Sequence, residues 1–131
     1  MSAPAGYSST PLLQKLGYVP GKISYVDSIA PYFTEVRDDI TLNAPSLYDF
    51  IHIFVKTPDE LQRSADYATS KLAKSGMLWI SWPKQTANPT SVLSSNIVRA
   101  YGLSIGLVDV KVAAIDAEWS GLKFVYRTKD R

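Results

Sequence analysis

Short apolar runs alternate along this chain with segments whose apolar residues recur at helical spacing. The clearest run, Phe50–Val55, is almost entirely apolar, as expected of a strand that is covered on both faces in a parallel sheet. Met77–Trp82 is a second run of this kind, and Lys22–Asp27 is rich in β-branched and aromatic residues, which favour strands. Because helical segments separate these runs, the pattern predicts a mainly parallel sheet with crossover helices.

Two helices are marked by their start signals. Threonine and proline at positions 10 and 11 open a short helix, which Gly17 ends. The Thr-Pro-Asp-Glu sequence at positions 57–60 forms a capping box with proline at the first helical position. The apolar residues that follow it at helical spacing predict a helix that ends at Ser75-Gly76.

The last third of the chain predicts a helix and a hairpin. Thr90 or Ser91 caps the helix, which runs to about Tyr101. Two strands follow, Leu107–Ile115 and Leu122–Arg127. The segment that joins them is too short for a parallel crossover, so we expect an antiparallel pair.

Together these elements predict a compact Rossmann-like α/β fold. Its sheet is mainly parallel, with five or six strands, flanking helices and a C-terminal antiparallel hairpin. The sixth strand depends on the short segment Ile40–Leu42, and Ile29–Val36 predicts a short helix. We expect a flexible N-terminal segment over residues 1–9, a single α/β domain over residues 10–127 and a C-terminal tail over residues 128–131.

The composition narrows the chemistry. None of the 131 residues is a cysteine, which excludes disulfides, cysteine-rich zinc sites and a thiol nucleophile. With 14 basic and 12 acidic residues, the net charge of +2 does not predict a nucleic acid or a membrane as partner. The N-terminus lacks the features of a signal peptide, and no stretch approaches the roughly 20 apolar residues of a membrane span. We therefore expect a soluble, cytoplasmic protein.

Two resemblances emerge from the order of these segments. The strand Phe50–Val55, the helix after it and Leu72–Ile80 resemble the C-terminal half of class I methyltransferases, as does the closing hairpin. Taken whole, the chain resembles a family of short bacterial proteins catalogued as a domain of unknown function. The segments that carry this second resemblance are Gly6–Leu12, Lys15–Gly17, Trp79–Lys84, Gly106–Val112 and Trp119–Phe124. That family implies no established activity.

One feature departs from the methyltransferases. A nucleotide or S-adenosylmethionine site in such a sheet needs glycines after the first strand, so that the backbone can approach the ligand. The segment Val26–Tyr32 has no glycine, and Pro31 removes a hydrogen-bond donor. Asp27, Asp38 and Asp39 are weak substitutes for the acidic residue that would hold a ribose. We therefore expect no methyl-donor site and no cofactor.

The single histidine, His52, lies within the apolar run of the strongest strand. We expect a neutral histidine that is hydrogen-bonded within the sheet. One histidine without cysteine does not support a zinc site, so we expect no metal. A serine–histidine–acid triad would have to use His52, yet the chain has no Gly-x-Ser-x-Gly elbow.

A tentative ligand-binding crevice comprises Ser81, Trp82, Lys84, Asp116 and Trp119. The first three end a predicted strand, and in open α/β sheets ligands bind at the carboxyl edge. The methyltransferase resemblance implies that the connection carrying the last two lies at the same edge. The alternative is that the tryptophans belong to the core and that Lys84 is solvated.

These observations favour a non-catalytic binding or regulatory domain on a degenerate Rossmann-like scaffold, with no catalytic residue. The alternative is a small-ligand-binding protein or enzyme in which Lys84 binds an anionic group and Asp116 handles a proton in the crevice. An S-adenosylmethionine-dependent methyltransferase ranks last. A protein partner, self-association or a small-molecule ligand all stay open, whereas we expect neither nucleic acid nor membrane.

Overall fold

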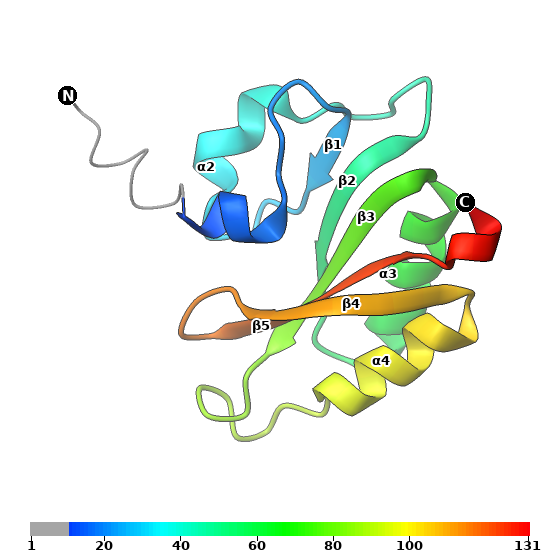
Figure 1. The fold of residues 1–131 in the computed structure, drawn as a ribbon. Helices are drawn as coiled ribbons and strands as arrows, with labels where there is room; N and C mark the ends of the chain where they lie inside the picture. Colours follow the sequence, from blue (N-terminus) through cyan, green and yellow to red (C-terminus); the bar gives the residue numbers. More distant parts are fainter. Residues whose placement is uncertain (1–10) are drawn as a thin grey trace.

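A five-stranded sheet forms the centre of the molecule (Figure 1). The computed structural model describes residues 11–131, so the predictions for residues 1–9 and for a cap at Thr10 lie outside it. The strands are β1 (Ser24–Val26), β2 (Tyr48–Phe54), β3 (Leu72–Pro83), β4 (Leu107–Ala114) and β5 (Trp119–Tyr126). The helices are α2 (Phe33–Val36), α3 (Pro58–Ser70) and α4 (Ser95–Ser104), with the 3₁₀ turns η1 (Arg37–Asp39) and η2 (Thr128–Asp130). Residues 11–16 form a further short helix.

The strand order is β1-β2-β3-β5-β4. β1, β2 and β3 run parallel, and β5 lies antiparallel between β3 and β4. Since β4 and β5 are consecutive in the chain, they pair as the expected hairpin. The prediction of a Rossmann-like α/β sheet with a closing hairpin is therefore confirmed, with five strands. The segment predicted as a sixth strand contributes only a bridge between Ser24 and Ile40.

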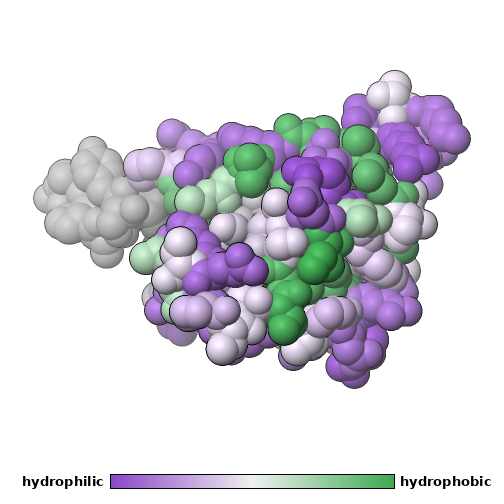
Figure 2. Space-filling model, turned by 90° about the horizontal axis from the view of Figure 1, so that it is seen from below, coloured by the Kyte–Doolittle hydropathy of each residue, from purple (hydrophilic) through white to green (hydrophobic). Residues whose placement is uncertain are grey.

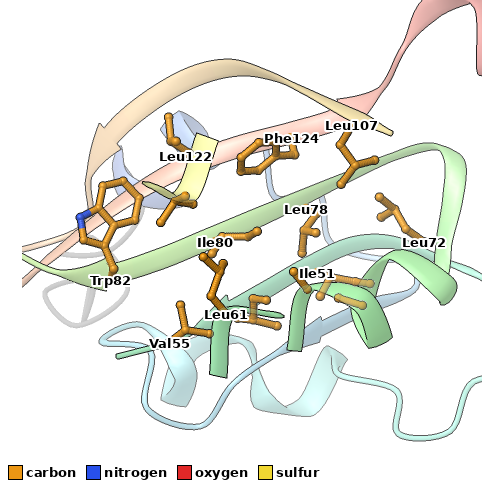
Figure 3. Close-up of a cluster of buried hydrophobic side chains, with 14 of the residues drawn as sticks. Ile51, Val55, Leu61, Leu72, Leu78, Ile80, Trp82, Leu107, Leu122 and Phe124 are labelled. Carbon is orange, nitrogen blue, oxygen red and sulfur yellow. The ribbon is translucent and has the colours of Figure 1, made fainter. Parts of the chain in front are cut away.

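Helices cover the two faces of the sheet unequally (Figure 1). α3 and α4 cover one face, where the larger core contains Ile51, Leu61, Leu78 and Phe124 among its buried side chains (Figure 3). The N-terminal segment up to α2 covers the other face over a second core cluster. Each fully buried large apolar side chain contributes roughly 1.5–3 kcal/mol, so both clusters stabilise the sheet.

All three tryptophans are buried. Trp79 packs in the second core cluster, and its Nε1–H donates to the Leu16 carbonyl oxygen over 2.8 Å. The ammonium group of Lys111 donates to the neighbouring Lys15 carbonyl oxygen at 2.8 Å. These two bonds hold the C-terminal end of the first short helix against the sheet, because the last carbonyls of a helix have no partner within it.

The structure corrects the predicted end of the helix after the capping box. α3 ends at Ser70 rather than at Ser75-Gly76, and β3 begins at Leu72. Tyr48 pairs with Leu72 and Phe50 pairs with Met77, so the Ser-Gly pair lies in an irregular stretch of β3. A Cβ atom at Gly76 would lie 2.8 Å from the Tyr48 carbonyl oxygen, which explains the glycine as a close approach of two strands.

The predicted start of the third helix is also wrong. Ser94 caps α4, and its hydroxyl oxygen accepts the backbone N–H of Ile97 at 3.3 Å. Thr90 instead donates its hydroxyl to the side-chain oxygen of Asn88, which closes a local turn. The helix therefore begins at Ser95 and extends beyond Tyr101 to Ser104.

The surface carries some apolar residues as well. In Figure 2, hydrophobic residues gather in a band across the face seen from below. Over the whole described surface, α4 exposes Ile97 and Leu103, and β4 exposes Val110 and Val112. Among residues 11–131, no helix is both long enough and apolar enough to cross a membrane.

Candidate functional site

A groove of about 600 Å³ lies beside the edge strand β1, on the face of the sheet that carries α3. Its floor comes from β1 and β2 and includes Tyr25, Tyr48 and Ile51. The side of α3 and the loop segment from Leu42 to Ala44 supply the rest of the lining. A volume of this size is typical of small-molecule sites, which measure about 300–1,000 Å³.

The groove follows from the way α3 is placed. Leu61, Ala65 and Ala68 are the buried residues of this helix, and they pack into the core over β2 and β3. Because β1 lies at the edge of the sheet, the helix leaves the adjoining face of β1 partly uncovered. Tyr25 and Asp27 therefore line an opening instead of a core.

Asp27 is the acidic group on the floor, immediately after the carboxyl end of β1. Its Oδ2 accepts the backbone N–H of Phe54 at 2.9 Å. Burial raises the pKa of this carboxyl group, while the Phe54 N–H and the Tyr25 hydroxyl partly offset that effect. Neither of the two ion pairs found among residues 11–131 involves it. Asp27 thus offers the groove a carboxylate without a cationic partner.

Aromatic rings form the most distinctive part of the lining. The rings of Tyr25 and Tyr48 meet edge to face, with centroids 6.4 Å apart. Burial and the nearby Asp27 raise the pKa of Tyr25 to about 12, so its hydroxyl stays protonated and can donate. Tyr67 lies on the α3 wall with its ring largely exposed, and the Lys71 ammonium is 5.7 Å from the ring centroid.

Two cations stand on the same wall of α3. Arg63 lines the groove and pairs with Asp59 at 2.9 Å, where both side chains are mostly exposed. An exposed pair of this kind is worth little, about 0–1 kcal/mol, so the guanidinium group can turn to a ligand at small cost. Lys71 lies further along the same wall. The groove is therefore lined by two carboxylates, those of Asp27 and of Glu60 on α3, and by two cations.

Tyr32, shortly after the end of β1, packs against the buried His52 of β2. Tyr32 is buried, and its hydroxyl lies 2.6 Å from Nδ1 of His52. Nε2 of His52 lies 2.7 Å from the hydroxyl oxygen of Ser81, and the Phe54 ring stacks on the imidazole. His52 is thus hydrogen-bonded within the sheet, as predicted. Burial lowers its pKa to about 3, so it is neutral near neutral pH.

The two backbone segments that carry the five residues of the predicted crevice lie side by side. The Lys84 N–H donates to the Glu118 carbonyl oxygen at 2.8 Å, which joins the end of β3 to the hairpin connection. Asp116 Oδ1 accepts the backbone N–H groups of Glu118 and Trp119, so this carboxylate caps the connection.

Their side chains, however, separate. Trp82 packs into the core beneath α3 and α4, whereas Trp119 belongs to the core cluster on the other face. Ser81 is fully buried against His52. The structure therefore brings these chain segments together without gathering their side chains around one opening. A ligand-binding role for the set stays a prediction.

The sequence analysis missed the groove, although one signal for it was present. Tyr25 and Asp27 are two residues apart on a strand, so their side chains share one face. The wall residues Arg63 and Tyr67 are four apart on α3 and also share a face. What no sequence pattern supplied was that these two faces meet.

Comparison with known proteins identifies the fold. No family model matches the chain, and no curated protein matches it. Solved structures do: magnesium protoporphyrin IX methyltransferase (ChlM) from Synechocystis PCC 6803 with bound SAH has 11% identity and a TM-score of 0.64, with 94% of this chain and 81% of that chain covered. The N-methyltransferase NodS from Bradyrhizobium japonicum WM9 has 11% sequence identity and a TM-score of 0.55, and the match covers 94% of this chain and 97% of that chain. Aeropyrum pernix fibrillarin in complex with natively bound S-adenosyl-L-methionine has 15% sequence identity and a TM-score of 0.56, and the match covers 91% of this chain and 74% of that chain.

These similarities correct the functional expectation. We expected a non-catalytic binding or regulatory domain and ranked an S-adenosylmethionine-dependent methyltransferase last. The solved structures that share this fold include several methyltransferases, and one of these enzymes is described with bound SAM and with bound SAH, which contradicts that expectation. The sequence argument depended on a single feature, the turn without glycine after β1. The chain has the α/β fold of class I methyltransferases.

Proposed function

We propose that this chain is an S-adenosylmethionine-binding protein of the methyltransferase type and that the groove between β1, β2 and α3 holds the methyl donor. The observation that carries the proposal is the position of the groove in a sheet of this fold. Asp27 lines it immediately after the carboxyl end of β1, the edge at which open α/β sheets bind ligands, and the lining continues along the strands to Tyr48 at the amino end of β2.

The turn after β1 does not fit a methyl donor. Between Asp27 and Tyr32 it has no glycine, and Tyr32 fills the space against His52. Without glycine, this turn lacks the feature that lets a backbone approach a ligand closely. The groove on the opposite face of the sheet does fit, because it has the volume of a nucleoside site and groups suited to each part of the donor.

Three features of the lining support specific contacts. The carboxylate of Asp27, which takes part in neither ion pair of residues 11–131, suits ribose hydroxyls or a cationic group. The guanidinium group of Arg63 suits the carboxylate of the amino acid part, because its N–H groups match a carboxylate in pairs. Tyr25 and the other tyrosine rings suit the flat base. When bound, S-adenosylmethionine supplies an electrophilic methyl group on a sulfonium ion.

Titration calorimetry with S-adenosylmethionine and SAH tests this proposal. We expect saturable binding of both to the wild-type protein. Asp27→Asn keeps an oxygen to accept the Phe54 N–H but removes the charge, and Arg63→Ala removes the guanidinium group. Each should raise Kd by about tenfold, which corresponds to about 1.4 kcal/mol. Gln62→Ala is the matched control, because Gln62 is exposed on α3 outside the groove lining.

Two results would reject the proposal. One is the absence of binding of either compound at millimolar concentration to folded protein. The other is binding that neither Asp27→Asn nor Arg63→Ala weakens relative to Gln62→Ala. Transfer of a labelled methyl group from S-adenosylmethionine to a small-molecule extract, reduced in the Asp27 variant, is the corresponding test of activity.

We also propose membership of the short bacterial family and a cytoplasmic location. The first rests on the sequence segments named above. The second rests on the α/β fold that the chain shares with the methyltransferases compared above. Fractionation of the native organism's cells would test the location.

A further inference from the structure

We propose that Lys111 and Lys123 together bind a dianionic oxyanion, such as a phosphate group, on the face of the sheet that the first short helix covers. Neither lysine lines the groove, which lies on the other face. The proposal therefore concerns a second ligand site, and it goes beyond the proposed function.

The two lysines are a like-charged pair across two strands. Lys111 of β4 and Lys123 of β5 are directly opposite each other, so their side chains point to the same face. Leu122 and Phe124, on either side of Lys123 in the chain, belong to the core beneath α3 and α4. Lys123 therefore points to the opposite face. Like charges placed directly opposite each other destabilise a sheet, so this pair is costly unless an anion joins it.

Lys123 stands on an interior strand of the sheet. β5 lies between β3 and β4, and Trp79, which pairs with Lys123 on β3, is fully buried. Lys123 is itself half-buried, and its ammonium group makes no hydrogen bond or ion pair with any residue from 11 to 131. Burial and the charge of Lys111 lower the pKa of Lys123. Within that part of the chain, this ammonium group thus has three free donors and no counter-ion.

The first short helix brings the two ammonium groups to one place. Nζ of Lys111 donates to the Lys15 carbonyl oxygen at 2.8 Å, which leaves two of its three N–H groups for a ligand. A Cβ atom at Gly17 would lie 3.5 Å from Nζ of Lys123, so this lysine also reaches the end of the helix. Lys15 adds a third cation on this side, where its Nζ donates to a backbone carbonyl of β4 at 3.2 Å.

A purely structural role accounts for Lys111 alone. A cation at the C-terminal end of a helix is favourable, and Lys111 satisfies one carbonyl oxygen there, whereas Lys123 makes no such bond. Two ammonium groups match the charge of a phosphate group, about −1.5 to −2 at pH 7, better than that of a carboxylate. We therefore expect the site to prefer phosphate to acetate.

Titration of the full chain with inorganic phosphate and with phenyl phosphate, at constant ionic strength, tests this site. We expect saturable NMR shifts of the backbone amides around residues 111 and 123, and at least tenfold weaker binding of acetate. Tighter binding of phenyl phosphate would support the site and point to a phosphorylated molecule as its ligand. Tighter binding of inorganic phosphate would support it and point to the free ion.

Lys111→Gln and Lys123→Gln should each raise the Kd for phosphate by about tenfold, because each removes a charge-assisted hydrogen bond. The glutamine amide at position 111 can still donate to the Lys15 carbonyl oxygen, so the contact with the helix is kept. Lys123→Arg keeps the charge and should bind phosphate. Lys22→Gln is the matched control, because it removes the same charge from an exposed lysine beside β1, at the other edge of the sheet.

Far-ultraviolet circular dichroism would verify that each variant folds. The proposal is overturned if phosphate shifts no amide near the two lysines, or if both glutamine variants at 111 and 123 bind phosphate as tightly as Lys22→Gln. S-adenosylmethionine binding, measured on the same variants, should not change. Loss of the phosphate site with S-adenosylmethionine binding intact would leave the proposed function standing, and the reverse result would leave this site standing.

Discussion

His52 shows how a single buried residue can make the stability of the fold depend on pH. It is fully buried in β2 and touches a hydroxyl at each ring nitrogen, Tyr32 on one side and Ser81 on the other. Its pKa is lowered by burial, with no acidic neighbour to offset the effect. A charged imidazolium would therefore have to be accommodated without a counter-ion, which is costly in a protein interior.

This arrangement predicts a pH dependence of stability. The pKa of His52 falls from 6.5 to about 3 on folding. The unfolded chain therefore takes up a proton first, and stability that is fully present above pH 6.5 is lost as the pH falls towards 3. We expect a loss of roughly 1.4 kcal/mol per pH unit from this group. Urea unfolding across this range would measure it.

His52→Gln supplies the comparison, because glutamine does not titrate. The variant should be less stable at neutral pH but should lose less stability between pH 6.5 and 3 than the wild type. Equal losses in the two proteins would show that the acid sensitivity arises elsewhere.

Gly102 gives a second prediction at the scale of one residue. Helix propensity alone would favour alanine at this position in α4, by roughly 1 kcal/mol. A Cβ atom there would overlap the Phe124 ring, which is fully buried. Gly102→Ala should therefore destabilise the protein by roughly 1–3 kcal/mol, the usual cost of overpacking. Thermal unfolding would measure it, and a stabilised variant would mean that the helix and the ring are not in contact.

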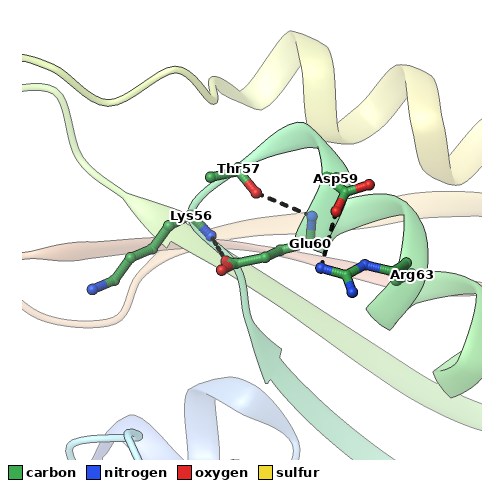
Figure 4. A network of polar contacts seen from close by, with 5 residues as sticks. All are labelled: Lys56, Thr57, Asp59, Glu60 and Arg63. Carbon is green, nitrogen blue, oxygen red and sulfur yellow. Dashed lines mark hydrogen bonds and ion pairs between the residues drawn. The ribbon is translucent and has the colours of Figure 1, made fainter.

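Among the elements, α3 has the clearest local origin. The Thr57 hydroxyl oxygen accepts the Glu60 N–H at 3.1 Å, and Glu60 accepts the Lys56 N–H at 2.7 Å (Figure 4). Asp59 and Arg63 form an ion pair across the first turn. The two hydrogen bonds satisfy backbone N–H donors at the start of the helix, whereas the ion pair joins two exposed side chains.

Thr57→Ala should therefore lower the free energy of unfolding by about 1 kcal/mol. Thr57→Ser keeps the oxygen and should cost only a few tenths of that. Chemical denaturation of both variants would check the pair. Equal effects of the two substitutions would show that the threonine methyl group, and not the cap, stabilises this end of α3.

The start of α3 could be predicted from the sequence, whereas its end and the start of α4 could not. The capping box at 57–60 is a local signal, and the structure confirms it. The end of α3 depends on the pairing of Tyr48 with Leu72, a long-range contact that no local pattern contains. Similarly, Ser94 and not Thr90 caps α4, because Asn88 engages Thr90 in a turn.

At the scale of the whole molecule, the fold could be predicted and the groove could not. Alternating apolar strands and helical segments indicated the sheet, and the short last connection indicated the hairpin. The groove requires α3, β1 and the loop at Leu42 to be placed relative to one another. The predicted crevice grouped Ser81 with Trp82, yet strand alternation puts these two side chains on opposite faces.

The structure separates two ways of binding a ligand that the sequence analysis treated as one: by the backbone of the turn after β1, and by side chains on a face of the sheet. The turn after β1 lacks the glycines that let a backbone approach a ligand closely, whereas Tyr25 on the same strand lines the groove. A missing glycine loop therefore argues against one binding mode only. A chain with this sheet can still bind a nucleoside by side chains.

NMR chemical-shift mapping with S-adenosylmethionine tests the proposed methyl-donor site most directly, because it shows both whether the ligand binds and where it binds. We predict saturable shifts of the backbone amides from Tyr25 to Asp27 and from Arg63 to Lys71, with little change at residues 81–84 and 116–119. Shifts confined to residues 81–84 and 116–119 would contradict a methyl-donor site in the groove. The absence of any shift at the highest soluble concentration of S-adenosylmethionine would contradict it as well.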